Sequence, residues 1–163
     1  MTARPAGPPF KAMLLSCFDP RIQAPIASWM MRSVPGSHAT SLRGQYSQFT
    51  IAGGAVGITA SFFPEAWRQT FWDNFATTIE LHGIKNLVAV NHSNCGSCGI
   101  AFGKDVPNDP ERERKIHIES VTELRQALSL RHPDIGFQAW YLARDPAGRF
   151  TEWTNLIPGP LIG

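Results

Sequence analysis

The chain has 163 residues, 43% of them hydrophobic, and a formal net charge of +2. This length and composition predict a single globular domain over residues 1–163 that can bury a normal core. The small charge, without a long basic run, argues against nucleic acid as a partner. No apolar stretch is long enough to span a bilayer, so no membrane partner is expected.

Residues 1–10 are rich in Pro and Gly and predict a flexible N-terminal arm. This stretch lacks the apolar centre of a secretory signal. The chain has three cysteines, and a small odd number suits metal binding or catalysis better than a disulfide framework. We therefore expect a cytoplasmic location, where thiols stay reduced.

Apolar runs and helix-like stretches alternate along the first half of the chain. In order, the pattern predicts a strand at 11–17, a helix at 26–32, a loop at 33–46, a strand at 48–52 and a helix at 64–82. The last of these begins at Pro64 and ends at His82, with Gly83 after it, as helix ends commonly do. Its apolar stripe is predicted to be Trp67, Phe71, Phe75, Thr78 and Leu81.

The second half continues the alternation. It predicts a strand at 86–90, a short helix at 98–103, turns at 105–110, a long helix at 111–131, a strand at 137–142 and an antiparallel edge strand at 149–153. The long helix is expected to break near its middle and to turn Ile118, Val121, Leu124 and Leu128 inward. Together these elements predict an α/β fold, a mostly parallel sheet of about four strands flanked by helices in three layers.

Soft metal ligands follow two of the predicted strands. Cys17 ends the first strand, while His92 and Cys95 follow the strand at 86–90. In parallel sheets, ligands bind outside the carboxyl ends of the strands, so these side chains are expected to share one site. Two thiolates and an imidazole suit tetrahedral Zn²⁺, and three protein ligands leave a position open for water.

Asp19 and Arg21 follow Cys17 at alternate positions, so in an extended turn all three side chains point the same way. Asp19 is a candidate acceptor for the proton of a zinc-bound hydroxide, and also a possible fourth ligand. Arg21 is expected to hold Asp19 ionised through a bidentate pair.

The motifs Cys17-x-Asp19-x-Arg21 and His92-x-x-Cys95-Gly96 resemble those of the β-class carbonic anhydrases over roughly residues 11–143. In that family two cysteines and a histidine hold zinc beside an Asp–Arg pair. The resemblance implies a β-carbonic anhydrase-like fold and hydration of carbon dioxide to bicarbonate by a zinc-bound hydroxide. It also implies a homodimer or higher homo-oligomer.

A rival function on the same site is hydrolysis of carbonyl sulfide or carbon disulfide. Thr50-Ile51 stand where the family usually has Arg-Asn, before Ala52-Gly53-Gly54. Residues 23–46 also differ from the usual stretch. An expected apolar pocket would favour the sulfur substrates; its residues would be Trp29, Trp67, Phe71 and Trp72.

Plainer interpretations stay open. The cysteines could be buried free thiols beside a loop histidine, and Asp19–Arg21 could be a surface ion pair of little energetic weight. A non-catalytic zinc-binding domain is the third alternative, with Cys98 or Asp19 closing the site as fourth ligand. His38 is either a proton shuttle or an ordinary exposed residue.

Overall fold

The structure is a computed structural model that describes residues 11–32 and 42–157. Three expectations lie outside the described residues: the arm at 1–10, most of the loop at 33–46, and the role of His38 within that loop.

A five-stranded sheet forms the centre of the molecule, in the order β2-β1-β3-β4-β5. Its strands are β1 (Ala12–Cys17), β2 (Tyr46–Ile51), β3 (Asn86–His92), β4 (Gly136–Arg144) and β5 (Phe150–Ile157). The first four pair in parallel, and β5 pairs with β4 in antiparallel fashion. The predicted α/β class, with about four parallel strands and an antiparallel edge, is confirmed.

Helices connect the parallel strands. They are α1 (Gln23–Arg32), α2 (Ala55–Thr59), α3 (Glu65–His82), α4 (Gly96–Phe102), a short 3₁₀ turn η1 (Val106–Asn108) and α5 (Pro110–Arg131). The sequence pattern missed α2, which is too short to show a period. The expected break in α5 was wrong, because this helix is continuous. Gly83 ends α3 in the left-handed conformation, with φ of 62°, as its sequence predicts.

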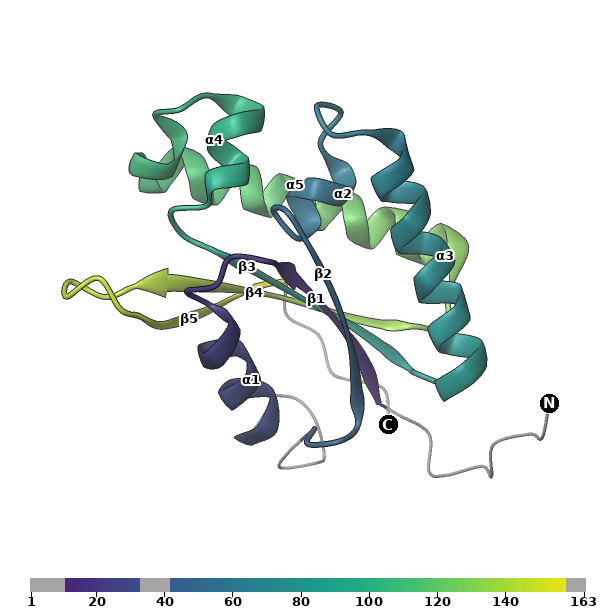
Figure 1. Cartoon of the computed structure of the whole chain (residues 1–163). Helices are drawn as coiled ribbons and strands as arrows, with labels where there is room; N and C mark the ends of the chain where they lie inside the picture. Colours follow the sequence, from purple (N-terminus) through teal and green to yellow (C-terminus); the bar gives the residue numbers. More distant parts are fainter. Residues whose placement is uncertain (1–10, 33–41, 158–163) are drawn as a thin grey trace.

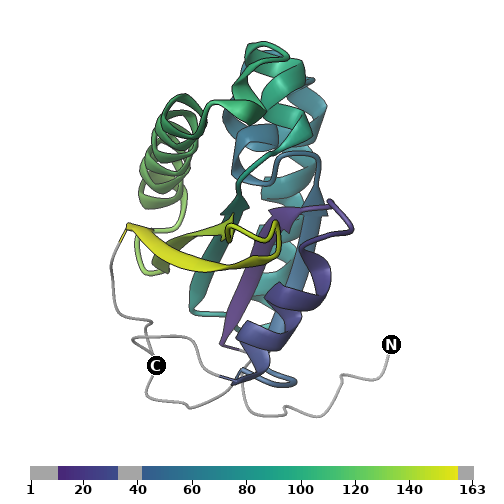
Figure 2. The same ribbon diagram turned by 90° about the vertical axis from the view of Figure 1, so that its left-hand side faces the viewer.

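The helices cover both faces of the sheet (Figures 1 and 2). On one face α1 packs Ile26 and Met30 against Leu14 and Val90. On the other face α2, α3 and α5 pack against the alternate side chains of the same strands. Strands buried on both faces explain the near-continuous apolar runs in β1 and β3.

Two residues expected to face inward do not. Leu81, in the last turn of α3, is 68% exposed, and Ile118 is 40% exposed. On α5 the buried position belongs instead to His117, with Val121 and Leu124 following on the same face. Ile118 is one residue, or about 100°, further round the helix. The inward face of α5 is therefore partly polar.

Within the described parts of the chain, none of the helices combines the length and the apolar character needed to cross a bilayer. The central strands β1 and β3 are parallel neighbours, with Ser16 opposite Val90. Their carboxyl ends therefore open onto the same edge of the sheet, where the candidate ligands lie.

Candidate metal centre

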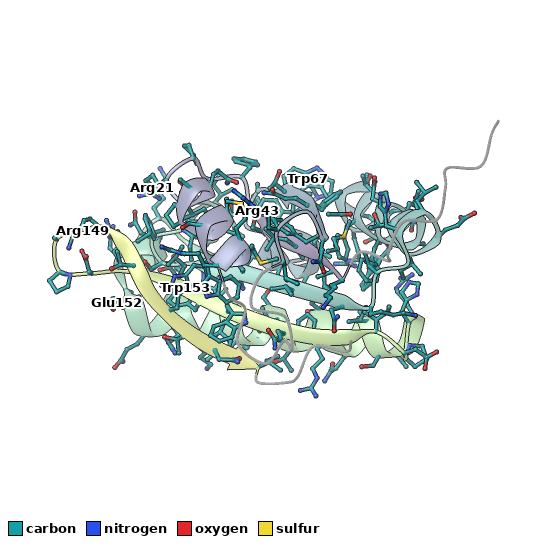
Figure 3. All side chains as sticks on the ribbon, turned by 90° about the horizontal axis from the view of Figure 1, so that it is seen from below. Arg21, Arg43, Trp67, Arg149, Glu152 and Trp153 are labelled. Atoms are coloured by element: carbon teal, nitrogen blue, oxygen red, sulfur yellow. The ribbon has the colours of Figure 1, made fainter. Side chains whose placement is uncertain are left out.

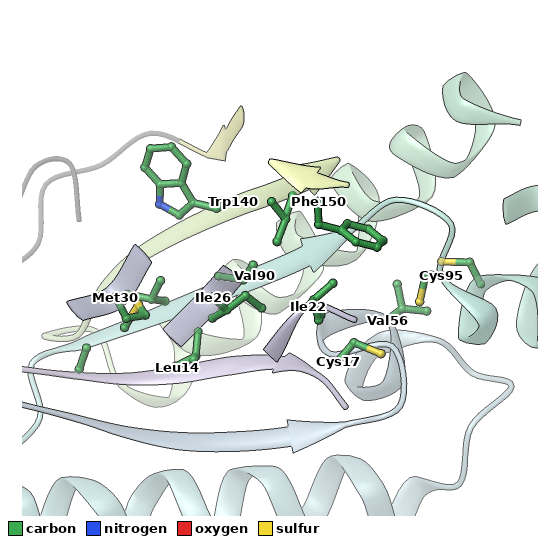
Figure 4. Close-up of a cluster of buried hydrophobic side chains, with 14 of the residues drawn as sticks. Leu14, Cys17, Ile22, Ile26, Met30, Val56, Val90, Cys95, Trp140 and Phe150 are labelled. Carbon is green, nitrogen blue, oxygen red and sulfur yellow. The ribbon is translucent and has the colours of Figure 1, made fainter. Parts of the chain in front are cut away.

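The three candidate ligands meet at this edge. Cys17 is the last residue of β1, His92 is the last residue of β3, and Cys95 is the N-cap of α4. Their ligand atoms all lie within 4.8 Å of one another, and all three residues are buried. Figure 4 shows Cys17 and Cys95 at the same end of a buried cluster, near Val56. Two thiols and an imidazole in this arrangement could hold one metal ion.

The environment of His92 leaves one ring nitrogen available. Nδ1 of His92 lies 2.9 Å from the carbonyl oxygen of Ser93. Because a carbonyl oxygen only accepts hydrogen bonds, Nδ1 carries the proton and Nε2 keeps its lone pair. Nε2 is buried and has no hydrogen-bond partner among the described residues. A carbonyl that fixes one ring nitrogen and frees the other is usual for metal-binding histidines.

The two thiols stay protonated unless a cation is present. Contact with Cys95, followed by burial, raises the pKa of Cys17 to about 12. Contact with Cys17 lowers the pKa of Cys95, but the nearby Cys98 thiol and burial outweigh it and raise that pKa to about 12. A coordinated divalent ion reverses this balance, because a metal-bound thiol loses its proton. The set therefore fits a thiophilic ion such as Zn²⁺.

Asp19 and Arg21 form a bidentate pair beside the three candidate ligands. Nε of Arg21 donates to Oδ1 of Asp19 at 3.0 Å, and Nη2 donates to Oδ2 at 2.6 Å. The Arg21 side chain is the main reason that the pKa of Asp19 lies below its ordinary value. Oδ2 of Asp19 also lies 3.9 Å from Nε2 of His92. An ionised carboxylate thus faces the place where an ion bound to His92 would sit.

The loop between His92 and Cys95 is held by residues that sequence reasoning missed. Asn94 has a φ of 55°, and its backbone N–H donates to Oε2 of Glu113 at 2.8 Å. The N–H of Cys95 donates to Oε1 of the same carboxylate at 2.7 Å. Asn before Cys-Gly was a sequence signal for a left-handed turn residue. Nothing local pointed to Glu113, which lies on α5.

The turn after β2 supports Cys17 through its backbone. The N–H of Gly53 donates to Sγ of Cys17 at 3.2 Å. Gly54 has a φ of 56°, and a Cβ there would come within 3.0 Å of the backbone nitrogen of Cys17. Glycine is therefore required where the chain passes this closely behind a candidate ligand.

The expected apolar pocket does not form around the three candidate ligands. Phe71 and Trp72 belong to the core between the sheet and α3. Trp29 stacks on Trp153, with ring centroids 4.4 Å apart. Figure 3 shows Trp153 well separated from Trp67. Trp29 therefore lies on the opposite face of the sheet from Phe71 and Trp72, because α1 and α3 cover different faces.

No family model matches the chain. Two curated relatives are uncharacterized proteins from Rickettsia conorii and Rickettsia bellii. They are 22% and 19% identical over 133 residues, covering 82% of this chain and 67% and 76% of the relatives. One solved structure that matches is the β-carbonic anhydrase CafD of Aspergillus fumigatus, with a TM-score of 0.51 and 14% identity over 96% of this chain and 94% of that one. The chain therefore has a β-carbonic anhydrase-like fold.

At 14% identity this likeness establishes the fold alone. Within the β-carbonic anhydrase-like fold, what the candidate site can do depends on its own residues. These are an imidazole with a free nitrogen, two buried thiols, and an ionised carboxylate held by an arginine.

Proposed function

We propose that the protein hydrates carbon dioxide to bicarbonate with zinc held by Cys17, His92 and Cys95. The observation that carries this proposal is the convergence of three buried ligand atoms within 4.8 Å, next to the Asp19–Arg21 pair. Three protein ligands leave a tetrahedral ion one open position, which distinguishes a catalytic zinc site from a structural one. The bound ion would supply the nucleophile by lowering the pKa of a water molecule.

Asp19 has the role of hydrogen-bond acceptor beside the open position. Its carboxylate accepts three hydrogen bonds from the Arg21 side chain, at 2.6, 3.0 and 3.2 Å. These bonds keep Asp19 ionised and engage both of its carboxylate oxygens. With one acceptor oxygen near Nε2 of His92, Asp19 would orient the attacking oxygen by accepting a hydrogen bond from it. Arg21 is a positioning residue in this scheme.

Hydrolysis of carbonyl sulfide or carbon disulfide uses the same set of residues and is an outcome of the test. Trp29 lies apart from Phe71 and Trp72, so the expected aromatic pocket is not assembled among the described residues. This alternative depends on the unusual Thr50-Ile51 at the end of β2 and on the unusual stretch at 23–46. A non-catalytic zinc domain would need a fourth protein ligand. The candidates are Asp19 and Cys98, whose thiol lies beside Cys95 and also in a second group with Glu113 and His117.

The deciding experiment is stopped-flow carbon dioxide hydration on protein of measured zinc content. We expect Cys17→Ser to lose the zinc of this site and the activity together. Asp19→Ala should keep the zinc and lose rate, by about 100-fold, because the attacking oxygen would no longer be oriented. Full activity in Asp19→Ala would contradict the role given to Asp19.

Two further assays separate the alternatives. Release of hydrogen sulfide from carbonyl sulfide, without carbon dioxide hydration, would assign the site to the sulfur substrates. Zinc binding without turnover of any of these substrates would favour a non-catalytic zinc domain. The homo-oligomer and the cytoplasmic location stay predictions, and sedimentation of the purified protein tests the first of them.

A further inference from the structure

A second group of potential metal ligands lies under the loop of the first site. Cys98 comes from α4, and Glu113 and His117 come from α5. The spacing of four residues places Glu113 and His117 on one face of their helix. The ligand atoms of all three residues lie within 4.8 Å of one another. Their exposed fractions are 0%, 1% and 0%, so the group is enclosed by protein.

The chemistry of this second cluster suits a borderline-soft divalent ion. A thiolate, an imidazole and a carboxylate are all ligands of zinc, and the sulfur and nitrogen disfavour Mg²⁺ and Ca²⁺. Sγ of Cys98 lies 3.5 Å from Nε2 of His117. Sulfur and nitrogen ligands on a tetrahedral zinc ion are about 3.6 Å apart, given bonds of about 2.3 and 2.1 Å. An S–H···N hydrogen bond has a similar length, so this distance alone does not decide between the two.

Glu113 supplies a stronger argument. Its buried carboxylate has no Lys, Arg or His nitrogen within ion-pair distance in the described parts of the chain. Its partners are neutral donors: two backbone N–H groups at 2.7 and 2.8 Å and the Tyr141 hydroxyl at 3.4 Å. A buried carboxylate without a positively charged partner is costly in its ionised form. Each carboxylate oxygen accepts two bonds, so Glu113 can still bind a cation.

The imidazole of His117 supplies a further potential ligand atom. Its ring is completely buried, and Nδ1 has no hydrogen-bond partner among the described residues. Nε2 of His117 lies 3.5 Å from Sγ of Cys98, so it is the nitrogen placed to share an ion with that thiol, while Nδ1 would carry the proton. A buried carboxylate without a cation and one nitrogen of a buried imidazole therefore lie beside the same thiol.

We propose that Cys98, Glu113 and His117 bind a second divalent ion of the zinc type. This site is separate from the one formed by Cys17, His92 and Cys95, and its existence does not depend on the hydration activity. Glu113 links the two sites, because its oxygens also accept the N–H groups of Asn94 and Cys95. An ion on Glu113 would fix this carboxylate and, through it, the loop that carries Cys95.

The test is a metal titration of the chelator-stripped full chain with Zn²⁺, and with Co²⁺ to follow thiolate ligation by visible absorption. We expect two equivalents to bind to the wild-type protein. Cys98→Ser and His117→Gln should each bind one equivalent, and so should Cys17→Ser. Ser97→Ala is the matched control, because it changes a buried neighbour of Cys98 that is in neither group, and it should still bind two.

The outcomes are distinct. One equivalent in the wild-type protein, unchanged in Cys98→Ser, would overturn the second site. Loss of both ions in Cys98→Ser would also overturn it, since Cys98 would then serve the first site. Two equivalents with no hydration of carbon dioxide would leave the second site standing and count against the proposed function alone. If the variants fail to fold, the number of ions bound by the wild-type protein still tests the proposal. Two ions support the second site, and one contradicts it.

Discussion

Arg21 and Asn94 are 73 positions apart, yet the guanidinium of Arg21 donates to both the side-chain and the backbone oxygen of Asn94, each at 3.0 Å. The same guanidinium holds Asp19. One side chain thus fixes the carboxylate after β1 and the loop between His92 and Cys95. The two strand ends that carry the candidate ligands are tied together by an arginine as well as by the sheet.

We therefore expect Arg21→Lys to impair the site without removing its metal. A lysine has a single point-like ammonium and cannot hold Asp19 in a bidentate pair while also binding Asn94. Loss of such an outer contact commonly costs about 10- to 100-fold in metal affinity or activity. The measurement is the hydration rate at full zinc loading.

The chain offers a matched control for this substitution. Arg149 and Asp145 form a similar local pair, with backbone and Nε donors at 2.9 and 3.0 Å, in the turn between β4 and β5. Arg149→Lys should leave the hydration rate unchanged. Equal losses in the two variants would show that the effect is not specific to the candidate site.

Acid unfolding should report the Asp19–Arg21 pair. Because the pair lowers the pKa of Asp19 in the folded state, this carboxylate stabilises the fold fully above its unfolded pKa of about 3.9. The contribution is lost as the pH falls through the lower pKa of the folded state. We expect Asp19→Asn to be less stable than wild type at pH 6, with the difference shrinking towards pH 2. The measurement is urea unfolding at several pH values, and a difference that does not vary with pH would contradict the assignment.

Removing the metal should lower thermal stability. An ion that binds only the folded state contributes about 2.7 kcal/mol when its free concentration is 100 times Kd. For a chain of this size each kcal/mol shifts Tm by about 2–4 °C, so chelation should lower Tm by about 5–10 °C per site. The loss should be smaller in Cys17→Ser, which lacks one candidate ligand. No change in Tm in the wild-type protein would argue against a metal bound in the folded state.

Part of the candidate site could be predicted from the sequence, because two of its candidate ligands lie at the ends of predicted strands. Cys17 and His92 end neighbouring parallel strands, and strand ends are visible as apolar runs followed by polar residues. The alternation of strands and helices predicted the fold class for the same reason. Both inferences use local pattern together with a general rule for where parallel strands end.

Contacts between residues that are far apart in the sequence could not be predicted in this way. Glu113 lies 18 positions from Cys95 on another helix, and only the tertiary contact between α5 and the loop before α4 brings the two together. The aromatic pocket failed for a related reason. The sequence cannot tell which face of the sheet a helix covers, so Trp29 and Phe71 could not be assigned to opposite faces.

The last prediction concerns the turn behind Cys17. Gly54 has a φ of 56° and a ψ of −118°, which side chains disfavour. A Cβ at this position would also meet two backbone atoms, the nitrogen of Cys17 at 3.0 Å and the carbonyl carbon of Ser16 at 3.1 Å. Backbone cannot move aside as a flexible side chain does. We expect Gly54→Ala to reduce the free energy of unfolding by about 2–4 kcal/mol, combining backbone strain with overpacking.

Gly148→Ala is the control, because Gly148 also has a positive φ, of 81°, but a Cβ there meets nothing within 4 Å. It should cost only the conformational penalty, about 1–2 kcal/mol. Urea unfolding of both variants measures the difference, which reports the extra strain of the Gly54 backbone together with the close approach to Ser16 and Cys17. Equal losses would mean that the turn after β2 yields easily, and Cys17 would then be less rigidly placed than the contacts of Gly53 and Gly54 imply.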